Sequence, residues 1–337
     1  MADARPSTVN WQAIVARYTR ADLRQAVWQL ANTLIPFVIC WVLMYFSLRV
    51  GYWLTLLLAF PAAGFMVRAF IIFHDCAHGS FFKSQRANNW LGGVLGVLCF
   101  TPYYRWRNHH AIHHATASDL DRRSGDGDIF TLTVAEYRAL PWPKRLLYGL
   151  YRHPLMLFTV GAPALFLFAH RFAYHTTGRR ERYSVYWTNL GLLGVVVVMA
   201  LTIGWQAFVL IELPIIVIAS IVGVWLFYVQ HQFEDTYYAR HANWSFVSAA
   251  LEGSSYYQLP KVLQWFTGNI GFHHVHHLCP RIPNYNLEKC HRENELFQAV
   301  KPMTLLDSLR TMAVRLWHED QRLMVGFMSD LTYVDFR

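Results

Sequence analysis

The chain has 337 residues, of which 54% are hydrophobic, 16% aromatic and only 15% charged. That composition favours a membrane protein whose aromatic residues gather at the interface between lipid and water. The formal net charge of +9 comes from scattered basic residues without a nucleic-acid-binding motif, which excludes nucleic acid as a partner and favours basic loops on the cytoplasmic side. The five cysteines are odd in number and imply no disulfide framework.

The N-terminal part of the chain predicts a polar segment followed by a membrane hairpin. Residues 1–32 are expected on the cytoplasmic side, and they show no apolar core with a small-residue cleavage site, so no signal peptide is predicted. Two apolar runs, 33–48 and 52–73, predict two helices joined by a tight turn. The second run leads directly into a histidine cluster, so its helix is expected to carry His74 and His78 out of the membrane.

Two shorter apolar stretches follow this hairpin. Residues 90–102 are too few to span comfortably, and they lie between two histidine clusters that must share one side of the membrane, so a re-entrant or interfacial helix is expected. Residues 155–172 are followed by Arg179, Arg180 and Arg182, which favours the cytoplasmic side and predicts a second interfacial segment.

The runs 186–204 and 207–229 predict a second membrane hairpin, and no later span is expected. The sequence therefore predicts an all-α integral membrane protein with four transmembrane helices in two hairpins, interfacial helices and a cytoplasmic helical cap. From Leu287 onward the tail is expected to be soluble amphipathic helix. Residues 1–337 are expected to form one domain, divided into a cytoplasmic segment (1–32), a first hairpin (33–73), a cytoplasmic and interfacial region (74–185), a second hairpin (186–229) and the cap (230–337).

Three histidine clusters predict a metal site. Their spacings are HxxxH, HxxHH and HxxHH, and their members are His74, His78; His110, His113, His114; and His273, His276, His277. Residues three and four apart share one face of a helix, so each cluster can aim its imidazoles at one point. Eight imidazoles are too many for one ion and suit two, and neutral imidazole binds iron, zinc and copper. Because the clusters adjoin the spans, the pattern indicates oxygen chemistry on a lipid.

Other chemistries fit this pattern less well. A zinc metalloprotease needs glutamate directly after the first histidine, where this chain has Asp75. Soluble di-iron bundles use Glu and Glu-x-x-His ligands, a pattern that the sequence lacks. A metal or proton transporter would place ionisable residues in the middle of the spans, whereas here the histidines stand at the ends of spans.

These residues resemble the membrane fatty-acid desaturase and hydroxylase superfamily, whose mark is three histidine boxes of this spacing. Four sequence stretches are similar to those of bacterial acyl-lipid desaturases of the omega-6 (Δ12) and related Δ5 type. They are HDCAHGSFF (74–82), RNHHAIHHATASDLD (107–121), QHQFED (230–235) and NIGFHHVHHLCPRIPNYNL (269–287). The resemblance implies an enzyme that forms a cis double bond in acyl chains of membrane glycerolipids, of the Δ12 type. A di-iron hydroxylase or ketolase acting on a carotenoid or an alkane is the alternative, and a transporter is a remote one.

The resemblance also implies the cofactor, the ligands and the partner. Two iron ions would be reduced by an external electron donor and would use O2 as co-substrate to remove hydrogen from two adjacent methylenes. The eight box histidines would be ligands, and His231 matches a further ligand that the superfamily supplies just after its last span. The third box begins with His273, not glutamine, and no fused cytochrome segment is seen, so the donor is expected to be a separate protein, by resemblance ferredoxin. A docking surface for an acidic donor is a second interpretation of the positive charge. The resemblance places the protein in the bacterial inner membrane, with the active site on the cytoplasmic side.

Four carboxylates near the clusters are candidates to accept the second N–H of a ligating imidazole, which fixes its tautomer and basicity. They are Asp75, Asp119, Glu234 and Asp235. For Asp119, a helix cap or a surface ion pair is an equal alternative. His109 and His274 lie off the shared spacing and are expected to support the ligands or to face solvent. The isolated histidines are expected to be structural or at the surface: His153, His170, His175, His241, His291 and His318.

Overall fold

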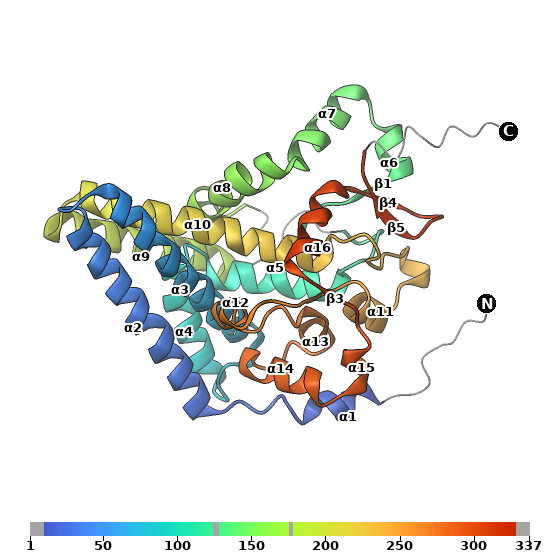
Figure 1. Ribbon diagram of the computed structural model, residues 1–337, viewed down its shortest axis with the longest axis horizontal. Helices are drawn as coiled ribbons and strands as arrows, with labels where there is room; N and C mark the ends of the chain where they lie inside the picture. The colour runs from blue at the N-terminus through green and yellow to red at the C-terminus, as the bar shows by residue number, and fades with distance from the viewer. Residues whose placement is uncertain (1–9, 124–127, 175–177, 328–337) are drawn as a thin grey trace.

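The computed structural model describes residues 10–123, 128–174 and 178–327 (Figure 1). Within these ranges, four helices are long and apolar enough to cross a membrane. They are α2 (Leu23–Ser47), α3 (Tyr52–His78), α9 (Arg179–Thr202) and α10 (Trp205–His231). The tight turns of both hairpins lie at the same end of the molecule, on the left of Figure 1, and the cap lies at the opposite end. The predicted all-α architecture with two membrane hairpins is confirmed.

The first helix is longer than its apolar run predicted. It begins at Leu23 rather than at residue 33, because the Asp22 side chain accepts hydrogen bonds from the backbone N–H groups of Arg24 and Gln25 and caps the helix. The early turns contain polar residues such as Gln29, which is buried against protein rather than exposed to lipid. Hydropathy alone cannot detect such a turn. Helix α9 likewise begins before its apolar run, at Arg179 rather than at residue 186.

Helix α3 is the central element of the membrane region and packs against both α2 and α10. Ala59, Ala62 and Ala63 are buried on it, and such small side chains let neighbouring helices approach closely. The helix continues through the first histidine cluster and ends at Gly79, whose φ of 70° is in the left-handed region that glycine adopts readily. One rigid element therefore joins the membrane core to the first cluster, as the sequence indicated.

Two further segments accompany the spans without matching them in length. Helix α4 (Gln85–Leu98) packs on α3 and α9 and exposes Trp90, in agreement with an interfacial helix. The second segment is made of α7 (Trp142–Tyr151), the π-helix η1 (Met156–Gly161), α8 (Ala162–Leu167) and the 3-10 turn η2 (Ala169–Arg171). It is bent by 68° between α7 and η1. The interfacial stretch expected at 155–172 is thus the second arm of a longer, broken segment.

Both ends of this broken segment lie on the side of the histidine clusters. At its start, the Tyr148 hydroxyl donates to the carbonyl of Arg315 in the cap, at 2.8 Å. At its end, the Arg105 guanidinium on the cluster-bearing helix α5 (Tyr103–Thr116) donates to the carbonyl of Phe172, at 3.1 Å. The Arg105 backbone N–H also donates to Ser184 in the first turns of α9, at 3.2 Å. These contacts favour a re-entrant segment over one that crosses the membrane.

The cap consists of short elements around the clusters. Its helices are α1 (Trp11–Ala16), α6 (Val134–Ala139), η3 (His241–Asn243), α11 (Phe246–Leu251), α12 (Lys261–Phe266), α13 (His273–Leu278), α14 (Asn284–Arg292), α15 (Glu295–Gln298), α16 (Leu305–Arg310) and η4 (Thr311–Ala313). An apolar cluster that includes Val15, Phe272, Val275, Leu287 and Phe297 joins α1 to α13, α14 and α15. The N-terminal segment is thus part of the cap core.

The tail departs from the predicted amphipathic helix, because much of it is irregular or in short strands. Strand β1 (Leu132–Thr133) pairs in parallel with β4 (Leu316–His318), which pairs antiparallel with β5 (Leu323–Val325). Strand β2 (Tyr256–Tyr257) pairs in parallel with β3 (Pro302–Met303). Leu316 and Trp317 are both buried and belong to different apolar clusters, because successive side chains of a strand point to opposite faces.

We predict that the broken segment enters the membrane surface without crossing it. In a variant whose five native cysteines are replaced, a cysteine at Arg179 should react only with a membrane-permeant reagent in intact cells, because α9 starts on the side of the clusters. A cysteine at Arg49, in the turn between α2 and α3, is the control and should react with an impermeant reagent. Labelling of the Arg179 position by the impermeant reagent would show that the segment crosses.

Candidate metal centre

Four elements deliver histidines to one buried region of the cap. The last turns of α3 supply His74 and His78, and α5 supplies three histidines. The six-residue helix α13 supplies three more, and His231 is the last residue of α10. All nine side chains predicted as ligands come from these elements: His74, His78, His110, His113, His114, His231, His273, His276 and His277. They fall into two separate groups.

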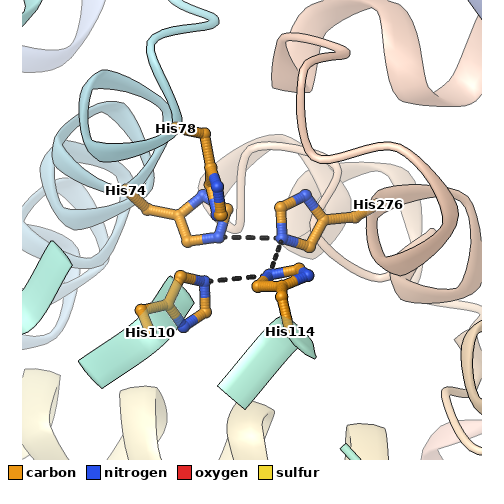
Figure 2. A group of neighbouring side chains, drawn as sticks. All are labelled: His74, His78, His110, His114 and His276. Atoms are coloured by element: carbon orange, nitrogen blue, oxygen red, sulfur yellow. Dashed lines mark hydrogen bonds between the residues drawn. The ribbon is translucent and has the colours of Figure 1, made fainter. Parts of the chain in front are cut away.

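The first group contains five imidazoles from three elements, and Figure 2 shows them pointing toward one another. Its members are His74, His78, His110, His114 and His276, and one ring nitrogen of each lies within 4.8 Å of that of every other. The Nε2 atom of His276 lies 3.1 Å from Nε2 of His74 and 3.0 Å from Nε2 of His114. Such separations match donors of one ion, because nitrogens about 2.1 Å from a metal are roughly 3 Å apart at right angles.

The second group contains four imidazoles and includes the one histidine outside the three boxes. Its members are His113, His231, His273 and His277, all of them buried. The Nε2 atom of His231 lies 3.2 Å from Nε2 of His113 and 2.9 Å from Nε2 of His273. His231 Nδ1 is 3.2 Å from the carbonyl oxygen of Gly253, to which only a protonated nitrogen can donate. That contact fixes the tautomer with an unprotonated Nε2 facing the other rings.

The chemistry of both groups suits a soft or borderline metal ion. Burial is the main cause that lowers the pKa of His110, His114, His273, His276 and His277 well below the usual range, so these imidazoles are neutral, as ligands must be. The Nε2 atoms of His78 and His277 are buried and have no hydrogen-bond partner. No cysteine or carboxylate of the described residues belongs to either group. The donor set therefore fits two cations held by nitrogen alone.

Only one of the four candidate carboxylates touches a histidine of either group. The Asp75 carboxylate lies 3.1 Å from His74 Nδ1. Asp119 instead lies 2.7 Å from His241 Nδ1, in agreement with the ion-pair alternative and not with support of a ligand. The prediction is wrong for Glu234 and Asp235. Both side chains are exposed, and Asp235 lies 3.5 Å from Lys301. Their position three and four residues after the end of α10 at His231 carries them out of the buried region.

A second carboxylate near the groups was not predicted. Asp128 lies in a loop after the second cluster, and its Oδ2 atom is 3.9 Å from His113 Nδ1. It stands outside the histidine boxes, and no spacing in the sequence marks it. It also lines the cavity described below.

The histidines outside the shared spacing of the clusters lie in different environments. His274 is buried and faces away from both groups; its Nε2 atom is 3.1 Å from His291 Nδ1, and burial lowers its pKa to about 3. His291 thus belongs to a buried pair rather than standing alone. His109 is half-buried and lines the cavity. His170 is buried near the carbonyl of Phe100, at 3.3 Å, and His153 is exposed. His175 lies outside the described residues.

An apolar cavity of about 580 Å³ opens beside the two groups. His74 and His110 of the first group and His273 of the second contribute to its wall. Along α10 the lining extends from Gln230 to Ile216, which corresponds to roughly 20 Å of helix directed into the membrane region. A long apolar slot that ends at a metal-binding nitrogen cluster is suited to a flexible hydrocarbon chain.

Comparison with known proteins assigns the family. The model of the family described as fatty acid desaturase matches residues 50–303. A fatty acid desaturase of Bacillus subtilis (strain 168) is 50% identical over 315 residues, which cover 94% of this chain and 89% of that protein. With all-histidine metal groups beside a membrane-directed apolar cavity, the class of protein is a membrane-bound oxidative lipid enzyme. The chain belongs to the fatty acid desaturase family and is a fatty acid desaturase.

More distant relatives have more specific names. An sn-1 acyl-lipid omega-3 desaturase (ferredoxin) of Synechocystis sp. is 27% identical over 69% of this chain and 64% of its own length. An sn-1 oleoyl-lipid 12-desaturase of the same organism is 26% identical over 66% of this chain and 63% of its own length. The present chain thus spans less than two thirds of each of these Synechocystis relatives.

We predict that His231→Ala abolishes desaturation while the protein remains folded and inserted, because it removes a central nitrogen of the second group. His241→Ala is the matched control: its ring is 47% exposed and faces Asp119, and most activity should be retained. Product formation in cells at equal expression is the measurement. Wild-type product levels in the His231 variant would exclude it as a ligand.

Proposed function

We propose that the protein is an oxygen-dependent desaturase that introduces a cis double bond of the Δ12 (omega-6) type into acyl chains of membrane glycerolipids. The observation that carries the proposal is the position of two all-histidine groups at one end of a long apolar cavity. The Synechocystis relatives named as acyl-lipid desaturases support the lipid-linked substrate, and the one named as a 12-desaturase supports the position.

The proposed reaction removes one hydrogen from each of two adjacent methylene groups. These two hydrogens, two electrons from an external donor and two protons reduce one O2 to two molecules of water, so atoms and electrons balance. The nine histidines would hold two iron ions, which supply the one-electron redox chemistry that dioxygen activation needs. Nitrogen ligands without negative charge keep such ions strongly oxidising, as the breaking of an unactivated C–H bond requires.

The residues of the cavity would bind and orient the acyl chain. Phe70 makes edge contacts with Trp106 and Phe166, whose ring centroids lie 5.5 Å and 6.1 Å from that of Phe70. Trp106 also stacks on His110 at 4.3 Å, so an apolar wall continues up to the first group. This wall would exclude water from the reacting methylenes and hold them beside the metal ligands.

The remaining parts of the proposal concern the donor and the membrane. We propose ferredoxin as a separate electron donor, supported by the printed name of the Synechocystis omega-3 relative and by the net charge of +9, which would attract an acidic partner. We also propose the bacterial inner membrane as the location, with both metal groups on the cytoplasmic side. The basic residues at the start of α9, Arg179, Arg180 and Arg182, support that orientation.

Lipid analysis of cells that express the chain tests this function directly. New cis-unsaturated acyl chains in glycerolipids are expected, with the double bond located by mass spectrometry of derivatised products. A double bond at another carbon would overturn the Δ12 assignment alone. Hydroxylated lipids, ketocarotenoids, or unchanged lipids with altered metal uptake would overturn desaturation.

We predict that the purified active protein contains two iron ions per chain, because two histidine groups of suitable geometry are present. Iron content by elemental analysis and the spectroscopic signature of nitrogen-ligated iron are the measurements. A single zinc ion, or iron bound by a cysteine such as Cys76 or Cys279, would contradict the prediction.

We predict that Gly223→Leu fills the cavity and impairs desaturation of long chains. Gly223 lines the cavity, and a new Cβ atom there meets nothing within 4 Å, so a side chain can be added at this position. Product should fall roughly tenfold or more, the scale of steric exclusion in an apolar pocket. Gly194→Leu, on the exposed face of α9 and equally unobstructed, is the control and should retain wild-type product. Equal activity of both variants would show that the chain does not occupy this part of the cavity.

A further inference from the structure

Asp75 is the only carboxylate in hydrogen-bond distance of a histidine of either group among the described residues, and it is itself completely enclosed. It is 1% exposed, and its Oδ1 atom lies 3.1 Å from Nδ1 of His74. With Nδ1 donating to Asp75, the Nε2 atom of His74 presents its lone pair to the first group. A carboxylate in this position also fixes the orientation of the imidazole ring.

The other oxygen of Asp75 is held by a residue far away in the sequence. Its Oδ2 atom accepts hydrogen bonds from the backbone N–H of Asn284 at 2.6 Å and from the Asn284 side-chain amide at 2.8 Å. Asn284 is 1% exposed and is the first residue of α14, so its backbone N–H is not used inside the helix. Two donors from one residue therefore fix the plane of the Asp75 carboxylate.

A third residue fixes the amide of Asn284 in turn. The Gln29 side chain on α2 donates to Asn284 Oδ1 at 2.8 Å, and its own carbonyl lies 3.3 Å from Asn284 Nδ2. Gln29 is 4% exposed. A continuous buried path thus links α2 to the first group through Gln29, Asn284, Asp75 and His74. Gln29 lies outside the residues matched by the family model, which begin at residue 50.

The second group has no comparable arrangement. His231 Nδ1 faces a neutral backbone carbonyl, and Asp128 is 3.9 Å from His113, beyond hydrogen-bond distance. The Nδ1 atoms of His113 and His273 are buried without a hydrogen-bond partner, as are those of His114 and His276 in the first group. The two groups therefore differ in electrostatics: a carboxylate is hydrogen-bonded directly to the first group, whereas none is so bonded to the second.

We propose that Asn284 is a positioning residue for His74, acting through Asp75, and that Gln29 holds Asn284 in place, so that this path controls metal binding at the first group selectively. The inference rests on the proposed two-ion site. Loss of the Asn284 amide leaves a buried carboxylate oxygen short of a donor, and Asp75 can then rotate away from His74. Removal of such a supporting contact typically weakens metal binding about 10- to 100-fold.

The experiment compares Asn284→Ala and Gln29→Ala with the control Asn286→Ala in detergent-purified full-length protein. Asn286 is on the same helix, and its side chain donates to the Tyr18 carbonyl at 2.9 Å, away from both groups. Iron bound per chain is measured in competition with a chelator, and Mössbauer spectra of the iron-57 protein resolve the two sites. Thermal unfolding of the iron-free proteins is recorded in parallel.

Asn284→Ala is expected to weaken one of the two iron sites about 10- to 100-fold and to alter one spectral component, with Gln29→Ala giving a smaller change of the same kind. The iron-free forms should unfold at the same temperature as the Asn286→Ala protein. Equal weakening of both sites, or lower unfolding temperatures with unchanged iron affinity, would overturn the proposal in favour of a purely structural role. Failure of the wild-type protein to bind two ions would instead overturn the proposed function.

Discussion

The rest of the structure depends on the enclosure of nine imidazoles whose nitrogens converge on two points. Each buried ring nitrogen without a hydrogen-bond partner costs about 1–3 kcal/mol, and six of them occur in these groups: Nε2 of His78 and His277 and Nδ1 of His113, His114, His273 and His276. That sum is comparable with the whole stability of a typical domain. The long helices and the apolar cap must therefore hold the rings together against this cost.

The same helices that hold the rings also shape the hydrocarbon cavity. Helix α3 contributes Met66, Phe70 and His74 to its wall, and α10 contributes residues from Ile216 to Gln230 just before His231. Metal position and cavity position are consequently coupled by rigid helix geometry, because residues on one helix cannot move independently along its axis. An enzyme that selects one pair of methylenes in a uniform chain needs that coupling, since the methylenes differ only in their distance from an end.

Much of this arrangement was predictable, because it follows from local spacing and hydropathy. The four spans, the two hairpins and the convergence of the box histidines follow from apolar runs and from the i, i+3 and i+4 geometry of helices. The errors have a common physical origin in contacts between distant residues. The partner of Asp119 and the position of Asp128 depend on tertiary packing, which no local pattern encodes. His231 required a resemblance, because a single histidine after a span has no spacing to distinguish it.

The short helix α13 has a consequence for how the protein is made. It spans His273–Leu278, near the end of a chain of 337 residues, and it supplies members to both histidine groups. A six-residue helix is not stable alone, so it forms only when the older parts of the chain are present to pack against it. During synthesis, all four spans leave the ribosome before either group can be completed. A growing chain therefore cannot assemble a complete oxidising centre before its membrane region has been made.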